Sequence, residues 1–243
     1  MKNSSQEKLS PKDHLAVALD VPDASTALDL VDRLEGTCRW LKVGMELYYA
    51  AGNSLVEKLR ERGFSIFLDL KLHDIPNTVA GAVRSVTSAG AELLTVHGSG
   101  GEAMLLAAAE ASQAPGSPKL IAVTVLTSMD AAALNAVGVS SSPAEQALRL
   151  ARLAASSGMD GMVCSAEEVR SLREAIGPEA VLVVPGIRPA GAAVDDQRRI
   201  ATPRDAIARG ASLLVVGRPI TRAGEPAAAA ASILREIEAA LPL

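Results

Sequence analysis

Residues 65–97 read SIFLDLKLHDIPNTVAGAVRSVTSAGAELLTVH and contain two apolar runs separated by an amphipathic stretch. The runs Ser65–Leu70 and Leu93–His97 are rich in aliphatic residues and have the length of strands. Between them, Thr78–Ala89 has the period of a helix and stops before Gly90, which favours a helix C-terminus. A strand, a helix and a strand in this order predict a right-handed unit with two parallel strands.

The same alternation continues along the chain. Six more aliphatic runs predict strands at His14–Asp20, Trp40–Gly44, Leu120–Leu126, Gly161–Cys164, Val181–Val184 and Ser212–Val216. Seven more amphipathic stretches predict helices at Ala24–Leu34, Asn53–Arg62, Glu102–Ser112, Pro143–Ser157, Ala166–Ile176, Pro203–Arg209 and Pro226–Leu241. Continuously apolar runs such as Leu15–Leu19 are typical of strands buried on both faces. Eight strand–helix units in 243 residues predict a single-domain α/β protein, a (β/α)8 TIM barrel, with an open doubly wound sheet as the alternative.

Composition indicates one globular domain. Hydrophobic residues make up 49% and charged residues 21%, and no linker interrupts the pattern, so we expect a flexible tail over residues 1–12 and the barrel over residues 13–243. A net charge of −4 without a basic run argues against a nucleic-acid partner. No apolar stretch reaches the roughly 18–20 residues that span a bilayer, and the polar start lacks a signal-peptide core. Cys38 and Cys164 lie in apolar segments, which indicates buried thiols in a reducing cytoplasm.

Charged residues follow or end several predicted strands. In a barrel of this kind the carboxyl ends of the strands meet at one rim, where active sites form. Asp69 and Lys71 are two residues apart and point to the same side of their strand, and Asp74 follows in the next loop. With Lys42 from the neighbouring strand they form a charge-balanced network. For these residues alone, a purely structural salt-bridge network is the alternative interpretation.

A candidate phosphate site follows the eighth predicted strand. Gly217 lets a backbone N–H approach an anion closely, and Arg218 offers a bidentate guanidinium. This position is a usual phosphate site in TIM barrels. Residues 185–201 are rich in Pro, Gly and Ala, which indicates a mobile lid. The 3 histidines lack ligand spacing, and no dinucleotide fingerprint or P-loop is present, so we expect no metal and no cofactor.

The segment LDLKLHDIPNTV, Leu68–Val79, closely resembles the signature of the orotidine 5′-phosphate decarboxylase family. Six further blocks are similar to that family in its order: Leu19-Asp20, Lys42–Glu46, Thr95–Gly98, Leu126–Ser128, Val184–Pro189 and Val216–Thr221. The resemblance covers roughly residues 14–235. It implies a cofactor-free barrel enzyme of pyrimidine biosynthesis that converts orotidine 5′-phosphate to uridine 5′-phosphate and CO2.

The resemblance also implies catalytic roles. Lys71 is the expected proton donor to the C6 carbanion, Asp69 is expected beside the substrate carboxylate, and Lys42 is expected to hold both. In the family, the second aspartate of the signature and the following threonine reach the other subunit's site. We therefore expect a homodimer with shared active sites, in which Asp74 and Thr78 act across the interface.

Substrate-binding positions follow from the same resemblance. Asp20 and Lys42 are expected at the ribose hydroxyls and Thr127 at the pyrimidine edge, while Arg188 and Gln197 match phosphate-ligand positions. The full expected set is Asp20, Lys42, Asp69, Ile75, Thr78, Thr127, Pro185, Arg188, Gln197, Gly217 and Arg218.

Two other functions compete with this interpretation. Magnesium-dependent sugar-phosphate decarboxylases and aldolases are similar in barrel and signature, but they hold the metal partly through an acidic residue of the second strand, where this chain has Lys42. A non-catalytic nucleotide-binding barrel is expected to have lost one of Asp69, Lys71 or Asp74, and all three are present.

Overall fold

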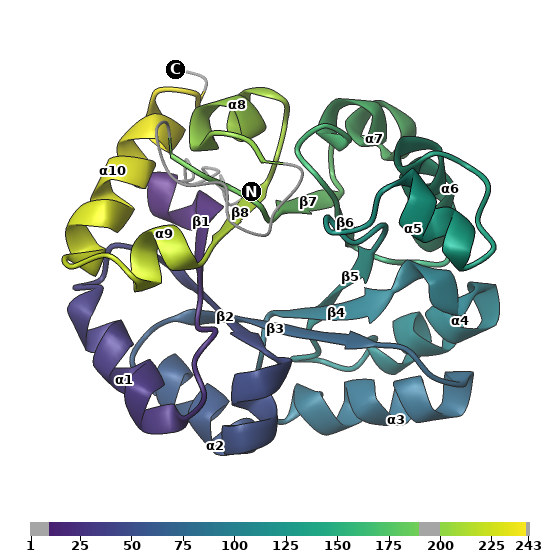
Figure 1. The fold of residues 1–243 in the computed structure, drawn as a ribbon. Coiled ribbons are helices and arrows are strands. Elements are labelled where there is room, and N and C mark those ends of the chain that lie inside the picture. Colours follow the sequence, from purple (N-terminus) through teal and green to yellow (C-terminus); the bar gives the residue numbers. More distant parts are fainter. Residues whose placement is uncertain (1–9, 190–199, 242–243) are drawn as a thin grey trace, which may run out of the picture.

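The aliphatic runs form strands that close into a parallel barrel in the computed structural model, which describes residues 10–189 and 200–241 (Figure 1). Each strand pairs with the next one along the chain, and the last pairs with the first. This closure confirms the single-domain TIM barrel and rules out the open sheet. The strands are β1 (Leu15–Ala18), β2 (Trp40–Gly44), β3 (Ser65–Leu72), β4 (Leu93–His97), β5 (Lys119–Val123), β6 (Gly161–Val163), β7 (Val181–Val184) and β8 (Leu213–Val216).

Helices surround the barrel (Figure 1). The longer ones are α1 (Ala24–Arg33), α2 (Met45–Glu61), α3 (Pro76–Thr87), α4 (Glu102–Ala111), α6 (Pro143–Ser156), α7 (Val169–Ile176) and α10 (Pro226–Glu238). Shorter helical segments are α5 (Ala131–Ala136), α8 (Pro203–Ala208), α9 (Arg218–Thr221) and the 3-10 turns η1 (Pro11–His14) and η2 (Gly98–Gly100). Within the described ranges, no helix has the length and apolarity needed to cross a bilayer.

Several predicted helix boundaries are wrong. The helix expected at Asn53 begins at Met45 and continues past Gly52, whose φ of 63° and ψ of −161° kink it. The helix expected at Thr78 begins at Pro76, because the fixed φ of proline suits a first helical position. The helices α5 and α9 were not expected. Asp130 is the N-cap residue of α5, since its side chain accepts a hydrogen bond from the N–H of Ala133 at 2.9 Å.

Strand ends differ from the prediction by a few residues. The run expected at Leu120–Leu126 forms a strand only as far as Val123, after which Val125 and Leu126 line a cavity. Of the tail expected over residues 1–12, residues 1–9 lie outside the described residues, and Pro11 begins η1. The division into tail and domain stays a prediction.

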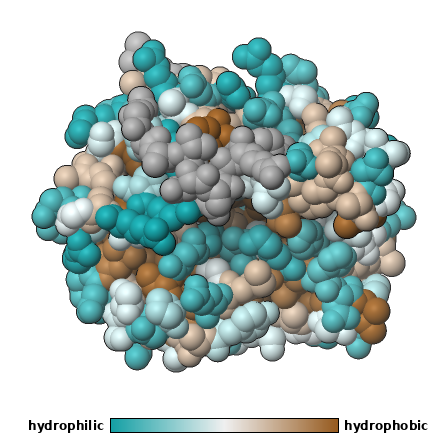
Figure 2. Space-filling view, viewed as in Figure 1, coloured by the Kyte–Doolittle hydropathy of each residue, from teal (hydrophilic) through white to brown (hydrophobic). Residues whose placement is uncertain are grey.

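Two apolar layers hold the barrel together. Side chains that point inward from the strands pack around Phe67 in the barrel interior, together with small and branched residues such as Ala16, Ile121 and Val215. The larger layer lies between strands and helices and is almost wholly aliphatic, in a chain of which only 2% of the residues are aromatic. Hydrophilic residues gather over the middle of the face shown in Figure 2, which views the molecule as in Figure 1. Because side chains fill the barrel interior, a site for polar chemistry is expected at the rim of the barrel and not inside it.

Candidate active site

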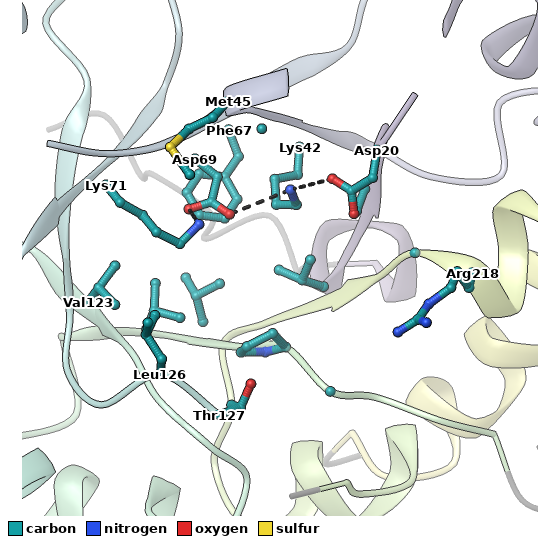
Figure 3. Close-up of a pocket in the computed structure, with 18 of the residues that line it drawn as sticks. Asp20, Lys42, Met45, Phe67, Asp69, Lys71, Val123, Leu126, Thr127 and Arg218 are labelled. Carbon is teal, nitrogen blue, oxygen red and sulfur yellow. Dashed lines mark hydrogen bonds and ion pairs between the residues drawn. The ribbon is translucent and has the colours of Figure 1, made fainter. Parts of the chain in front are cut away.

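A cavity of about 600 Å³ lies at the carboxyl ends of the strands. Its walls come from strands β1, β2, β3, β5, β6, β7 and β8 and from the segments that follow them (Figure 3). The charged side chains that line it are Asp20, Lys42, Glu46, Asp69, Lys71, Arg188, Arg218 and Arg222. The rim predicted from the strand ends is therefore a single concave site.

Four of these residues form a row of alternating charge. Lys42 Nζ lies 3.0 Å from Asp20 Oδ1 and 3.5 Å from Asp69 Oδ2. The other oxygen, Asp69 Oδ1, lies 2.9 Å from Lys71 Nζ. Figure 3 shows the Asp69, Lys42 and Asp20 side chains pointing toward one another along one wall of the cavity. We call Asp20, Lys42, Asp69 and Lys71 the charged row.

The pairing of β2 with β3 brings the charged row together. In this register Lys42 lies opposite Phe67, and Gly44 lies opposite Asp69. A Cβ atom on Gly44 would lie 3.1 Å from Lys42 Nζ and 3.4 Å from Asp20 Oδ1, so glycine leaves room for that ion pair. The leucines that alternate with Asp69 and Lys71 pack in the opposite direction: Leu68 and Leu70 are buried in the layer under the helices.

Electrostatics keep Asp69 ionised. Burial alone would raise the pKa of this carboxyl. The ammonium groups of Lys42 and Lys71, with hydrogen bonds from Lys71 and Thr95, outweigh burial and hold the pKa of Asp69 below its usual value. The cavity therefore presents a fixed carboxylate beside two cations.

His97 lies at the end of β4, with its ring centroid 5.2 Å from that of His73. Burial, His73 and the Lys71 ammonium lower the pKa of His97, although Asp69 opposes them. The Nδ1 atom of His97 is buried and has no hydrogen-bond partner among the described residues. The lowered pKa favours the neutral form of His97, and His97 is not among the residues that line the cavity.

A second wall carries the predicted phosphate and pyrimidine residues. Thr127, Pro185, Arg188, Gly217 and Arg218 all line the cavity. Figure 3 shows Arg218 on the β8 side, well separated from Lys71. The predicted Gln197, and most of the predicted lid, lie outside the described residues.

Three predicted residues do not join this cavity. Asp74, Ile75 and Thr78 are exposed and are absent from its lining within one chain. The side chain of Asp74 accepts a hydrogen bond from the N–H of Ile75 at 2.6 Å. None of the three has a hydrogen bond or ion pair to the charged row among those of the described residues.

Sequence reasoning missed several lining residues. Arg222 follows Arg218 by four residues. In a helix this spacing places two side chains on the same face, so a predicted helix after β8 would have placed Arg222 beside Arg218 at the cavity. Met45 and Glu46 line the cavity from the first turn of α2, which was predicted to begin later. Within the described residues, no group of three or more His, Cys, Asp or Glu side chains is arranged to hold a metal ion.

Comparisons with known proteins find a family that matches most of the chain. Residues 13–233 match the family described as "Orotidine 5'-phosphate decarboxylase / HUMPS family". A relative from Halorhodospira halophila, named orotidine 5'-phosphate decarboxylase, is 55% identical over 227 residues, which cover 93% of this chain and 96% of the relative. One of the same name from Nitrosospira multiformis is 54% identical over 224 residues, covering 92% and 93%.

Solved structures share the fold. A crystal structure of orotidine 5'-phosphate decarboxylase from Lactobacillus acidophilus is 41% identical, with a TM-score of 0.81 over 92% of this chain and 98% of that one. An uncharacterized conserved protein from Geobacillus kaustophilus is 38% identical, with a TM-score of 0.79 over 92% and 99% of the two chains.

Proposed function

The chain belongs to the orotidine 5′-phosphate decarboxylase / HUMPS family, and on this premise we propose that it converts orotidine 5′-phosphate to uridine 5′-phosphate and CO2. The observation that carries the proposal is the charged row: a partly buried carboxylate, Asp69, lies 2.9 Å from one ammonium and 3.5 Å from another. Such preorganised charge stabilises a carbanion more strongly than water does, because it needs no reorganisation during the reaction.

The proposed reaction breaks the bond between C6 and the carboxyl carbon. CO2 leaves, the bonding electron pair stays on C6, and Lys71 Nζ donates a proton to that carbon. Solvent then returns a proton to the amine. The ionised Asp69 lies beside the departing carboxylate and holds the Lys71 ammonium within 2.9 Å. Lys71 therefore stabilises the charge as it develops and then removes it.

The rest of the cavity suits a nucleotide monophosphate. Gly217, Arg218 and Arg188 are the proposed phosphate ligands, because guanidinium groups bind phosphate oxygens in pairs. Thr127 is proposed to read the pyrimidine edge, and Pro185 is proposed as a further substrate contact because it lines the same cavity. Asp20 and Lys42, at the far end of the charged row from Lys71, are proposed to bind the ribose hydroxyls.

A homodimer with shared sites is part of the proposal. Asp74 and Ile75 lie on the segment that joins β3 to α3, and Thr78 lies in the first turn of α3. All three are exposed, so their side chains are available to a second subunit. We assign them to the partner's cavity. In that arrangement each active site draws its charged row from one chain and Asp74 from the other.

The cytoplasm is the proposed location, and pyrimidine nucleotide synthesis the proposed pathway. Neither cysteine forms a disulfide and both are buried, and burial raises the pKa of the Cys38 thiol to about 12. Buried thiols outside disulfides suit a reducing compartment.

The magnesium-dependent sugar-phosphate enzymes are less well supported. Their metal is held partly by an acidic residue of the second strand, and this chain places Lys42 there. Its ammonium lies between Asp20 and Asp69, where it would repel a divalent cation. A non-catalytic barrel is disfavoured because the charged row is complete.

A turnover assay tests the proposal. The purified protein is mixed with orotidine 5′-phosphate, and the loss of orotate absorbance is followed with and without EDTA. We expect the same rate in both, with uridine 5′-phosphate as product. Binding of uridine 5′-phosphate without turnover would favour the non-catalytic barrel. Loss of activity on chelation, restored by magnesium, would favour the metal-dependent alternative.

A further inference from the structure

The pairing of β3 with β4 is interrupted at the charged row. Leu68 pairs with Leu94, and the next pair is Leu72 with Val96. Four steps along β3 therefore match two steps along β4, and β3 bulges by two residues. Lys71 lies inside this bulge with a φ of 51°, a left-handed backbone conformation that residues other than glycine seldom adopt.

A side chain of β4, that of Thr95, accepts a backbone hydrogen bond from β3 where the pairing of the two strands is interrupted. The backbone N–H of Lys71 donates a hydrogen bond of 2.8 Å to the hydroxyl of Thr95. That hydroxyl donates in turn to Asp69 Oδ1 at 3.1 Å. Thr95 is fully buried, so no water competes for these two bonds.

The direction of both hydrogen bonds is fixed by chemistry. An amide N–H only donates, and an ionised carboxylate only accepts, so the single hydroxyl proton of Thr95 must point at Asp69. The same Asp69 oxygen also lies 2.9 Å from Lys71 Nζ. Thr95 thus links the backbone of Lys71 to the carboxylate that holds the Lys71 ammonium.

We propose that Thr95 is a positioning residue, whose hydroxyl holds the β3 bulge in register and thereby aims Lys71 and Asp69 at the reacting carbon. Thr95 is not among the residues that line the cavity. The expected effect of Thr95 on turnover rests on the proposed function. Its expected effect on the position and the pKa of Asp69 does not.

Three variants separate the hydroxyl from the packing around it. Thr95→Val keeps the shape and removes both hydrogen bonds. Thr95→Ser keeps the hydroxyl and removes a methyl group. Thr124→Val is the matched control. Thr124 is a buried threonine directly after β5, and its hydroxyl donates to Val163 O at 2.9 Å, a partner outside the charged row. Circular dichroism and thermal melting establish that each variant is folded.

Steady-state kinetics give the first readout. We expect Thr95→Val to lower kcat about 10²-fold, the loss typical of a catalytic group displaced by about 1 Å, with little change in KM. The proposed phosphate ligands Arg188, Gly217 and Arg218 are unchanged in this variant, so orotidine 5′-phosphate should still bind. Thr95→Ser is expected to retain most of the turnover, and Thr124→Val to turn over like the parent. If valine is not accommodated at position 95, Thr95→Ala removes the same hydroxyl without branching atoms.

The second readout needs no activity. Carboxyl carbon NMR of aspartate-labelled protein, assigned with Asp69→Asn, follows the titration of Asp69. The pKa of Asp69 is expected to be higher in Thr95→Val than in the parent, because a hydrogen bond that lowers it is gone. Thr124→Val should leave it unchanged.

The two readouts distinguish the possible failures. A parent protein that never decarboxylates orotidine 5′-phosphate defeats the proposed function, while the NMR titration still decides the role of Thr95. An active parent whose Thr95→Val variant loses no more turnover than Thr124→Val overturns the positioning role. So does an Asp69 titration that is the same with and without the hydroxyl.

Discussion

Lys71 combines a strained backbone with a charge that is held in place. Glu35 is the other non-glycine residue with positive φ in residues 10–189 and 200–241. Positive φ at such a residue costs on the order of 1–3 kcal/mol and persists only where the surrounding structure demands it. Here the charged row and the β3 bulge make that demand, which is why the strain coincides with the proposed proton donor.

Removing the Lys71 side chain tests that assignment. We expect Lys71→Ala to stay folded and to lower kcat by on the order of 10³-fold or more, because both the cation and the proton donor are lost. Circular dichroism checks the fold, and a discontinuous assay measures residual turnover. Lys58→Ala, an exposed lysine of α2, controls for loss of one positive charge. Near-parental turnover in folded Lys71→Ala would remove Lys71 from the chemistry.

His97 predicts a pH dependence of stability. Its pKa is lowered in the folded protein from the usual 6.5, so the unfolded chain takes up a proton at a higher pH than the folded one. The contribution of neutral His97 to the free energy of unfolding is therefore complete above pH 6.5 and is lost as pH falls through the lowered pKa of the folded protein. Denaturant melts at several pH values should show a smaller acid loss for His97→Gln than for the parent. Parallel profiles would mean that His97 does not resist protonation.

The junction of β8 with α9 places Arg218 against the cavity. Gly217 is the N-cap residue of α9, with φ −105° and ψ −106°, and Arg218 and Arg222 lie one turn apart beyond it. Both line the same cavity. The junction thus supplies two guanidinium groups next to Gly217, where the lack of a Cβ atom lets an anion approach the backbone.

Arg218→Ala is expected to lower kcat/KM for orotidine 5′-phosphate by roughly 10- to 100-fold, the worth of one or two charge-assisted hydrogen bonds. Binding energy from a remote phosphate supports both binding and catalysis at the base, so the loss should not be confined to KM. Orotidine without its phosphate is the control substrate. If the parent and Arg218→Ala differ as much on orotidine as on the phosphate ester, Arg218 does not bind the phosphate.

The pairing of β6 with β7 depends on a glycine. A Cβ atom at Gly161 would overlap the carbonyl oxygen of Val181, which is backbone and cannot turn aside. We expect Gly161→Ala to lower the free energy of unfolding by about 1–3 kcal/mol, as overpacking does. Gly224→Ala is the control, because Gly224 is exposed and nothing lies within 4 Å of its added Cβ. Equal urea midpoints for the two variants would contradict this account.

The complete barrel leaves Asp74 outside its own cavity, and subunit exchange tests where it acts. Lys71→Ala and Asp74→Ala are each expected to be inactive as homodimers. In a mixed dimer with shared sites, one site carries both lesions and the other carries neither. Equal mixing makes about half of the dimers mixed, so about a quarter of the parental activity should return. If mass spectrometry confirms exchange and no activity returns, Asp74 acts within its own subunit.

Local patterns in the sequence were enough to predict most of the fold. Strands β2, β4 and β7 begin and end as predicted, because continuous aliphatic runs bounded by polar residues identify buried strands without reference to the rest of the chain. The sequence also placed Lys42, Asp69 and Lys71 at one rim, since parallel strands end together.

Only the tertiary structure decided how those residues meet. The bulge that gives Lys71 its positive φ arises from pairing with β4, and the partner that stabilises it, Thr95, is 24 residues away along the chain. The sequence likewise did not predict α5, α9 or the kink at Gly52. Periodicity reports which side of an element is buried, but register shifts and hydrogen bonds between strands depend on the neighbour's position, which no local pattern contains.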